Sequence, residues 1–175
     1  MLRAILFDLD DTLVDWSGAA AMGAEDIGDT EFRPEQLLEY VSVDQRVCAM
    51  LRELGRRYLL AVVSNGSARM QRGKILRAGL CGLFDGVFIS GEMGVRKPDA
   101  DIFRRALAAL DCPPDEALFV GDDPVTDIAG AKSAGMQTCW ISRGRTLPPD
   151  TPEAHWRCET VLDLPKAPLC LTPIN

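Results

Sequence analysis

Short apolar runs alternate along the chain with longer segments in which apolar and polar residues recur at helical spacing. Each run is almost entirely apolar, as expected of a strand that is covered on both faces of its sheet. The pattern predicts strands at Ala4–Phe7, Tyr58–Val63, Gly86–Ile89, Ala117–Val120 and Thr138–Ile141.

Amphipathic segments between these runs predict helices. The segment Asp101–Leu110 places its apolar residues on one face and its two arginines off that face. Ser67–Ala78 begins at a candidate N-cap serine and stops before a glycine. Further helices are predicted at Asp44–Leu54 and Thr126–Ala134. Alternation of strands and helices at this spacing predicts an α/β fold with a mainly parallel sheet and helices on both faces.

Two segments do not follow this alternation. Residues 15–43 are Gly-rich and weakly periodic, with one short helix predicted at Pro34–Tyr40, and we interpret them as a short flap. Residues 143–175 are rich in proline, so we expect an irregular tail packed on the core, with a short strand or turn at "ETVLDL". The length of the chain favours a single domain over residues 1–175.

The composition of the chain indicates which partners and which cellular compartment are expected. The chain has 175 residues, 47% of them hydrophobic, and a net charge of −7, which argues against nucleic acid or an anionic membrane as the main partner. Six cysteines without a CxxC pair, together with one histidine, argue against a zinc site. The sequence has neither a signal-peptide pattern at its start nor an apolar run near the ~20 residues of a membrane span. We therefore expect a soluble cytoplasmic protein with reduced thiols.

Polar side chains follow four of the predicted strands, at the edge where open parallel sheets bind their ligands. They are Asp8, Asp10 and Thr12 after the first strand, Ser64 and Asn65 after the second, Lys97 after the third, and Asp122, Asp123 and Asp127 after the fourth. Carboxylates at this density repel one another and cannot all ionise cheaply without a cation. Mg²⁺ suits such a set because it is a hard ion that carboxylates, water and phosphate oxygens bind.

The other polar groups at this edge are suited to a phosphoryl group. The "SNGS" turn, residues 64–67, opens a helix whose first N–H groups can bind phosphate. Lys97 adds positive charge where negative charge develops during phosphoryl transfer. Taken singly, each motif is also typical of a solvated turn, a helix cap or a surface lysine. The interpretation as a phosphoryl-transfer site depends on their occurrence together.

These motifs closely resemble those of the haloacid dehalogenase-like hydrolase superfamily, in its phosphatase branch. That family has an apolar strand ending in DxDxT, here "FDLDDTL", and another ending in Ser or Thr, here "AVVSNG". It has a lysine that often precedes proline, here "GVRKPD", and an acidic motif, here "VGDDPVTDIAGAKSAGM". The motifs cover roughly residues 3–14 and 58–141, which is most of the predicted core.

The resemblance implies a Rossmann-like three-layer sandwich and Mg²⁺-dependent hydrolysis of a phosphate monoester through an aspartyl-phosphate. It assigns Asp8 as the nucleophile and a metal ligand. Asp10 is then the general acid/base, with its main-chain carbonyl on the metal, and Thr12 steadies the loop.

The remaining assignments also come from the resemblance. Ser64 and Lys97 hold the phosphate, with help from the N–H of Asn65. Asp122 ligates Mg²⁺, either directly or through water. Asp127 supports the metal or the lysine from behind, and Asp123 is a second candidate for that role.

The chain departs from the family between its first and second motifs. Residues 15–43 are too few for the helical bundle that covers the site in many members, so we expect a minimal cap and an open site. An open site could accept a phosphorylated small molecule or a bulky phosphoester. A second subunit of a homodimer could also cover it.

Other functions fit the motifs less well. Dehalogenases of the family lack the second aspartate, here Asp10, because a halide needs no proton. A phosphomutase needs a cap to hold its intermediate. A receiver-type signalling domain is phosphorylated on an aspartate after a central strand, where this chain has Ser64. A binding protein that kept the fold and lost turnover remains as the alternative.

Overall fold

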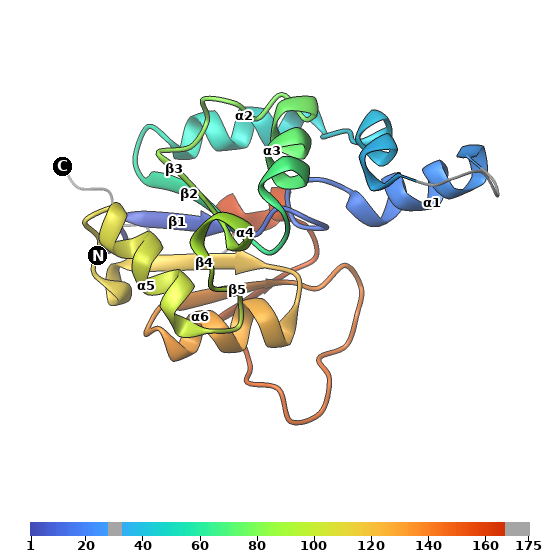
Figure 1. Ribbon diagram of the computed structural model, residues 1–175. Coiled ribbons are helices and arrows are strands. Elements are labelled where there is room, and N and C mark those ends of the chain that lie inside the picture. The colour runs from blue at the N-terminus through green and yellow to red at the C-terminus, as the bar shows by residue number, and fades with distance from the viewer. Residues whose placement is uncertain (28–32, 167–175) are drawn as a thin grey trace.

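The computed structural model describes residues 1–27 and 33–166. Its centre is a six-stranded sheet in the order β3-β2-β1-β4-β5-β6, and every neighbouring pair of strands is parallel (Figure 1). The strands are β1 (Ala4–Phe7), β2 (Leu59–Ser64), β3 (Gly86–Ile89), β4 (Ala117–Gly121), β5 (Gln137–Ile141) and β6 (Trp156–Cys158). The predicted α/β fold is confirmed, and β6 adds a strand that the sequence did not predict.

The helices cover both faces of this sheet (Figure 1). The α-helices are α1 (Trp16–Ile27), α2 (Gln45–Leu54), α3 (Ala68–Arg77), α4 (Ser90–Met93), α5 (Ala100–Ala109) and α6 (Gly130–Ser133). The described residues also form three 3-10 helices and one π-helix. The 3-10 helices are η1 (Pro34–Tyr40), η2 (Pro114–Glu116) and η4 (Val161–Lys166), and the π-helix is η3 (Pro124–Ala129). No helix in the described ranges is long and apolar enough to cross a bilayer.

Alternate residues of β1 pack into two hydrophobic cores, one on each face of the sheet. Ile5 and Phe7 lie in a core with apolar side chains of α2, α3 and η4. Ala4 and Leu6 lie in the other core, with side chains of α5 and α6. Because β1 is buried on both faces, its sequence is continuously apolar rather than alternating.

The register of β1 brings the candidate loops together. Phe7, the last residue of β1, is level with Val62 of β2 and with Val120 of β4. The N–H of Asp8 still donates to the carbonyl of Val120, at 2.9 Å. The chain segments that follow β1, β2 and β4 therefore leave the sheet side by side at its carboxyl edge.

Capping side chains fix where several helices begin. Ser67 accepts a hydrogen bond from the N–H of Met70 at the start of α3, as the sequence predicted. Asp99 accepts a hydrogen bond from the N–H of Asp101 at the start of α5. The helix predicted over Thr126–Ala134 begins earlier, at Pro124, because Asp123 caps it and its first turns are a π-helix.

The segment between the first and second motifs holds α1 and η1. Figure 1 shows α1 projecting from the carboxyl edge of the sheet, with η1 packed against α1 and α3. The sequence predicted η1 but not α1, because this helix is rich in alanine and glycine and carries little of the apolar periodicity that identifies an amphipathic helix. Residues 28–32 of this segment lie outside the described residues.

Up to residue 166, the tail has more regular structure than the sequence predicted. Trp156–Cys158 pairs with β5 as strand β6, and "ETVLDL" contributes to the 3-10 helix η4 instead of a strand. Val161 and Leu164 of η4 are buried in the core beneath α2, which explains why this Pro-rich segment is structured. Residues 167–175, including Cys170, lie outside the described residues, and the five described cysteines are free thiols.

Candidate active site

A buried ionic triad occupies the carboxyl edge of the sheet. Lys97 Nζ lies 2.5 Å from Asp8 Oδ1 and 2.7 Å from Asp127 Oδ1. Asp8 directly follows β1, Asp127 lies in η3, and Lys97 lies between α4 and α5. The exposed fraction of these side chains is 9% for Asp8, 2% for Lys97 and 1% for Asp127. The structure therefore brings together three residues that are far apart in the sequence.

Neighbouring residues hold this triad in place. Asn65 accepts a hydrogen bond from the N–H of Lys97 and donates one to its carbonyl, both at 2.9 Å. The side chain of Asn65 thus fixes the lysine, and its main-chain N–H remains the predicted phosphate donor. Gly121 leaves space for Asp127, because a Cβ at Gly121 would lie 2.3 Å from Asp127 Oδ2.

Burial and charged neighbours shift the pKa values of Asp8 and Lys97. Burial raises the pKa of Asp8 to about 8, although Lys97 lowers it. Burial also lowers the pKa of Lys97, but Asp127 and Asp8 outweigh that effect, so this pKa lies above its ordinary value. The lysine is therefore an ammonium at neutral pH, and Asp8 needs further positive charge nearby to ionise readily.

Three carboxylates could supply that positive charge by holding a cation. Asp8, Asp122 and Asp127 each offer one oxygen, and these oxygens all lie within 4.8 Å of one another. A hard oxygen-only set of this size fits Mg²⁺. Asp127 also contacts Lys97 through Oδ1 and the N–H of Asp123 through Oδ2, so Asp8 and Asp122 are the better candidates for direct ligands.

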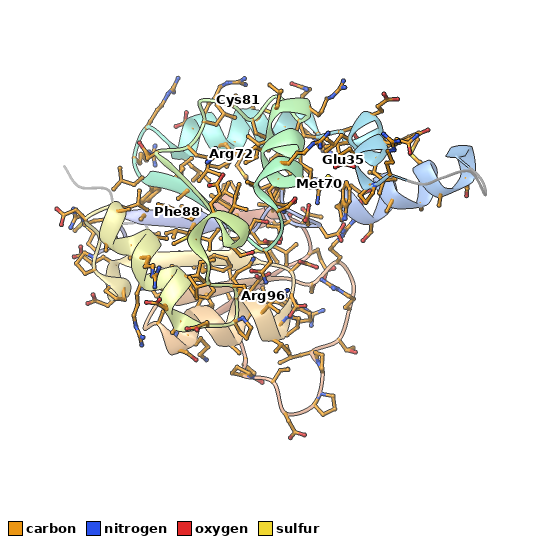
Figure 2. The ribbon with its side chains drawn as sticks, viewed as in Figure 1. Glu35, Met70, Arg72, Cys81, Phe88 and Arg96 are labelled. Atoms are coloured by element: carbon orange, nitrogen blue, oxygen red, sulfur yellow. The ribbon has the colours of Figure 1, made fainter. Side chains whose placement is uncertain are left out.

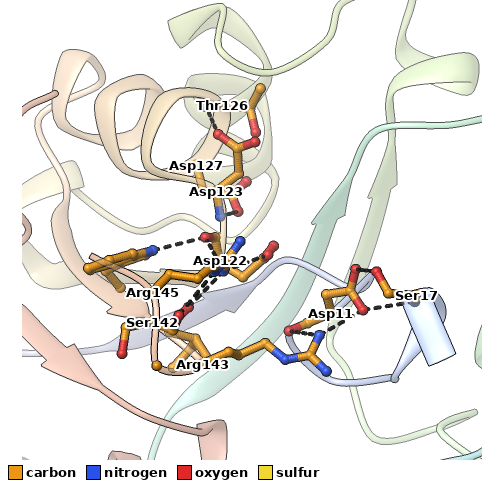
Figure 3. A network of polar contacts seen from close by, with 12 residues as sticks. Asp11, Ser17, Asp122, Asp123, Thr126, Asp127, Ser142, Arg143 and Arg145 are labelled. Atoms are coloured by element: carbon orange, nitrogen blue, oxygen red, sulfur yellow. Dashed lines mark hydrogen bonds and ion pairs between the residues drawn. The ribbon is translucent and has the colours of Figure 1, made fainter. Parts of the chain in front are cut away.

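Contacts from β5 and the loop after it position Asp122. The indole N–H of Trp140 donates to the main-chain carbonyl of Asp122 at 2.9 Å. Arg145 donates to the same carbonyl and, at 3.0 Å, to Asp122 Oδ2 (Figure 3). Burial and then Asp127 raise the pKa of Asp122 to about 6, in spite of Arg145. Asp123, the second candidate, accepts from the N–H groups of Val125 and Thr126 and so caps η3.

Asp10 faces a different set of partners from those of Asp8. Lys74 Nζ lies 2.8 Å from both carboxylate oxygens of Asp10. Gln71 Nε2 donates to Asp10 Oδ2 at 3.0 Å and to Ser64 Oγ at 2.6 Å. The two aspartates after β1 therefore lie in different environments.

The turn after Asp10 is anchored to the loop after β5. Asp11 has a positive φ of 57° and accepts hydrogen bonds from the N–H and the hydroxyl of Ser17. Arg143 donates to Asp11 at 2.8 Å (Figure 3). It also donates to Asp15 at 2.9 Å. Thr12 lies within this turn with its Oγ1 buried and without a hydrogen-bond partner among the described residues. These contacts fix the chain where α1 begins.

Sequence reasoning missed several residues of the site. Gln71, Lys74, Trp16, Arg143 and Arg145 all contact predicted site residues or their partners. A signal existed for the first two, because Gln71 and Lys74 are one helical turn apart on a helix that begins at a predicted phosphate-binding turn. The arginines follow β5, a strand end to which no role was assigned.

Comparisons with known proteins agree with this geometry. A family model described as haloacid dehalogenase-like hydrolase matches residues 17–135. The chain is 48% identical over 107 residues to a phosphoserine phosphatase of Thermus thermophilus, covering 61% of this chain and 42% of that protein. It is 34% identical over 130 residues to the N-acylneuraminate-9-phosphatase of Homo sapiens, covering 73% and 52%. The chain spans about half the length of the curated relatives that it matches.

Solved structures share the fold. A HAD phosphatase from Thermococcus onnurineus matches with a TM-score of 0.80 at 24% identity, over 94% of this chain and 97% of that chain. A 2-haloacid dehalogenase from Pseudomonas syringae matches with a TM-score of 0.74, also at 24% identity, over 95% and 97%. Because both kinds of hydrolase superpose well, the fold alone does not choose between phosphate and halide chemistry.

Proposed function

Because the chain belongs to the haloacid dehalogenase-like hydrolase family, we propose that it is a phosphatase that hydrolyses a phosphate monoester with the help of Mg²⁺. The observation that carries the proposal is the convergence of the Asp8, Asp122 and Asp127 oxygens within 4.8 Å of one another, beside the ammonium of Lys97. Asp10 supports phosphate over halide, because a halide leaving group needs no proton.

In the first step, a carboxylate oxygen of Asp8 attacks phosphorus and the bond from phosphorus to the ester oxygen breaks. Asp10 gives its proton to that departing oxygen, so the alcohol leaves neutral. Lys97, Ser64 and the N–H of Asn65 hold the phosphoryl oxygens while negative charge develops on them. The product of this step is an aspartyl-phosphate on Asp8.

In the second step, a water molecule attacks the same phosphorus and loses its proton to Asp10, now a carboxylate. The bond between phosphorus and the Asp8 oxygen breaks, which releases inorganic phosphate and regenerates the Asp8 carboxylate. Asp10 ends with the proton that it needs for the next cycle. Two easier displacements thereby replace one difficult displacement.

Asp8 and Asp122 would hold Mg²⁺, together with the main-chain carbonyl of Asp10, and Asp127 would support Lys97 and the site from behind. A bound Mg²⁺ supplies positive charge that reduces the repulsion between the Asp8 carboxylate and the phosphate oxygens. The raised pKa of Asp8, about 8, is the physical reason why this site benefits from a cation at neutral pH.

The proposed substrate class follows from the short segment at residues 15–43. With only α1 and η1 described there, the site would be open, and it would admit a phosphorylated small molecule or a bulky phosphoester. The names of the relatives, a phosphoserine phosphatase and an N-acylneuraminate-9-phosphatase, support a phosphorylated small molecule. A second copy of the chain could cover the site in a homodimer.

A second candidate is a binding protein that keeps the fold without turnover. The short segment at residues 15–43 favours it, because α1 and η1 are smaller than the helical bundle that covers the site in many members of the family. This candidate and the phosphatase make opposite predictions for phosphate release.

The deciding experiment is a phosphate-release screen with p-nitrophenyl phosphate, nucleotides, sugar phosphates, phosphoglycolate and phosphopeptides. We expect release with Mg²⁺, loss of release with a chelator, and loss in Asp8→Asn with an unchanged circular dichroism spectrum. An absence of release across the panel with Mg²⁺ would favour the binding protein.

A further inference from the structure

Two buried polar side chains of α3 converge on the carboxylate of Asp10. Lys74 Nζ lies 2.8 Å from each Asp10 oxygen, and Gln71 Nε2 lies 3.0 Å from Asp10 Oδ2. The two residues are one helical turn apart, so they present their polar ends on the same face of α3. The exposed fraction of the Lys74 side chain is only 4%, whereas that of Asp10 is 26%.

The third member of this cluster comes from the short segment after the first motif. Trp16, the first residue of α1, places its ring over the ammonium of Lys74, with 3.4 Å between Nζ and the ring centroid. This is a close cation–π contact, which a desolvated ammonium favours. The segment that replaces a larger cap therefore still contacts the lysine beside the proposed general acid.

The cluster connects two parts of the site. Gln71 Nε2 donates to Ser64 Oγ at 2.6 Å as well as to Asp10, so one amide lies between a proposed phosphate-binding residue and the proposed acid. Burying an ammonium and an amide is costly unless each is paired, and here both are paired to residues of the site. A stability role alone would be served as well by apolar residues at these positions.

We propose that Gln71 and Lys74 are positioning residues that set the orientation of the Asp10 carboxyl, and that Trp16 holds Lys74 in place. The proposal rests on the proposed function, in which Asp10 protonates the departing oxygen. Contacts to both carboxylate oxygens fix the carboxyl plane, and the amide fixes one edge of it. Loss of these contacts leaves Asp10 free to turn toward solvent, away from the reacting oxygen.

The dependence on the leaving group separates positioning from a structural role. A p-nitrophenolate ion departs readily without a proton, whereas an alkoxide does not. Misplacing Asp10 therefore slows the first step for an alkyl phosphate far more than for p-nitrophenyl phosphate. The parameter kcat/KM reports on this step, and its ratio between the two substrates is independent of how much of the protein is folded.

The test compares Lys74→Met, Gln71→Leu and Asp10→Asn with the wild-type chain, using p-nitrophenyl phosphate and the best sugar phosphate or nucleotide monophosphate of the screen. We expect the alkyl-to-aryl ratio of kcat/KM to fall about tenfold or more in Lys74→Met, within the ~10²–10⁴-fold that general acid catalysis supplies. Gln71→Leu should lower the ratio in the same direction, and it carries the test if Lys74→Met does not fold.

Arg72 provides the matched control on the same helix. It lies between the two positioning residues in sequence and is labelled on α3 in Figure 2. It pairs with Glu92 instead of Asp10. Arg72→Met also removes one positive charge from α3, and the ratio should stay at the wild-type value. At Trp16, the substitution by leucine should lower the ratio and the substitution by phenylalanine should preserve it, because phenylalanine keeps an aromatic face over Lys74.

The outcomes distinguish this inference from the proposed function. If Asp10→Asn lowers the ratio while Lys74→Met and Gln71→Leu leave it unchanged, the positioning role is wrong and the phosphatase assignment stands. If Asp10→Asn itself leaves the ratio unchanged, or the wild-type chain hydrolyses neither substrate, the acid assignment fails and the positioning role fails with it.

Discussion

The ammonium of Lys97 lies 2.5 Å from the carboxylate of Asp8, although the two residues are 89 positions apart in the sequence. This contact joins the group proposed to attack phosphorus to the group proposed to neutralise the phosphoryl oxygens. Because both groups are buried, each shifts the pKa of the other: Lys97 lowers that of Asp8, and Asp8 raises that of Lys97.

Removal of Lys97 should destabilise the fold as well as the site. In Lys97→Met, the carboxylates of Asp8 and Asp127 lose their shared partner in a buried environment. Breaking one side of a buried ion pair costs about 3–5 kcal/mol, so the free energy of unfolding should fall by that order. Urea denaturation without added metal measures it.

The double variant Lys97→Met/Asp127→Asn is the control for this interpretation. It replaces one of the two buried carboxyl groups that Lys97→Met leaves without their partner, so it should recover part of the lost stability while remaining inactive. If the double variant is less stable than Lys97→Met by the full cost of Asp127→Asn in the wild-type background, the two residues are not coupled and the interpretation is wrong.

The pH dependence of stability should carry a specific sign in the presence of a chelator. The pKa of Asp8 is raised to about 8 in the folded chain, from an ordinary value of 3.8, and that of Asp122 to about 6. At pH values between the ordinary pKa of 3.8 and the raised pKa of about 8, the folded state holds protons that the unfolded state has released. The free energy of unfolding is therefore highest at low pH and falls as the pH rises toward 8.

When the folded state binds one proton more than the unfolded state, the free energy of unfolding changes by about 1.4 kcal/mol per pH unit. We therefore expect this free energy to fall by about 2 kcal/mol or more between pH 5 and pH 8. Asp8→Asn should flatten most of this slope. Millimolar Mg²⁺ should oppose it, because the ion binds the ionised carboxylates and stabilises the folded state at high pH. A slope of opposite sign without metal would contradict the burial of Asp8.

Gly121 should be intolerant of any side chain. The methyl group in Gly121→Ala would lie 2.3 Å from Asp127 Oδ2 and 2.6 Å from its Cγ, so Asp127 must move. We expect a loss of about 1–3 kcal/mol in stability from overpacking, and a larger fractional loss of phosphatase activity because Lys97 moves with Asp127. A variant with wild-type kinetics and an unchanged thermal midpoint would show that this close approach is unimportant.

Much of the fold could be predicted because the strands are buried on both faces. β1, β2 and β4 carry continuous apolar runs, which leave few alternatives once the parallel sheet is inferred. β6 was missed because it has only three residues, of which Trp156 is partly buried and Arg157 is exposed, and because it follows a Pro-rich loop. α1 was missed because alanine favours a helix through propensity and not through an apolar stripe.

Some residues of the candidate site could also be predicted from the sequence, and others could not. Asp8, Lys97 and Asp127 could be predicted as candidate site residues because each is charged and lies in a segment that follows a predicted strand. Lys74 and Gln71 were missed because, in the sequence, they look like ordinary polar residues of an amphipathic helix. Their contacts with Asp10 in the folded chain show that Lys74 and Gln71 face the site.

The central claim is that Asp8 becomes phosphorylated, and the Asp10→Asn variant offers the most direct measurement of it. With p-nitrophenyl phosphate and Mg²⁺, the first step needs no proton donor, but the second step lacks the base that activates water, so the aspartyl-phosphate should accumulate. Mass spectrometry of the acid-quenched protein should find one phosphoryl group per chain, on the peptide that contains Asp8, and none in Asp8→Asn/Asp10→Asn. A phosphoryl group on another residue, or turnover by Asp8→Asn at the wild-type rate, would contradict the account.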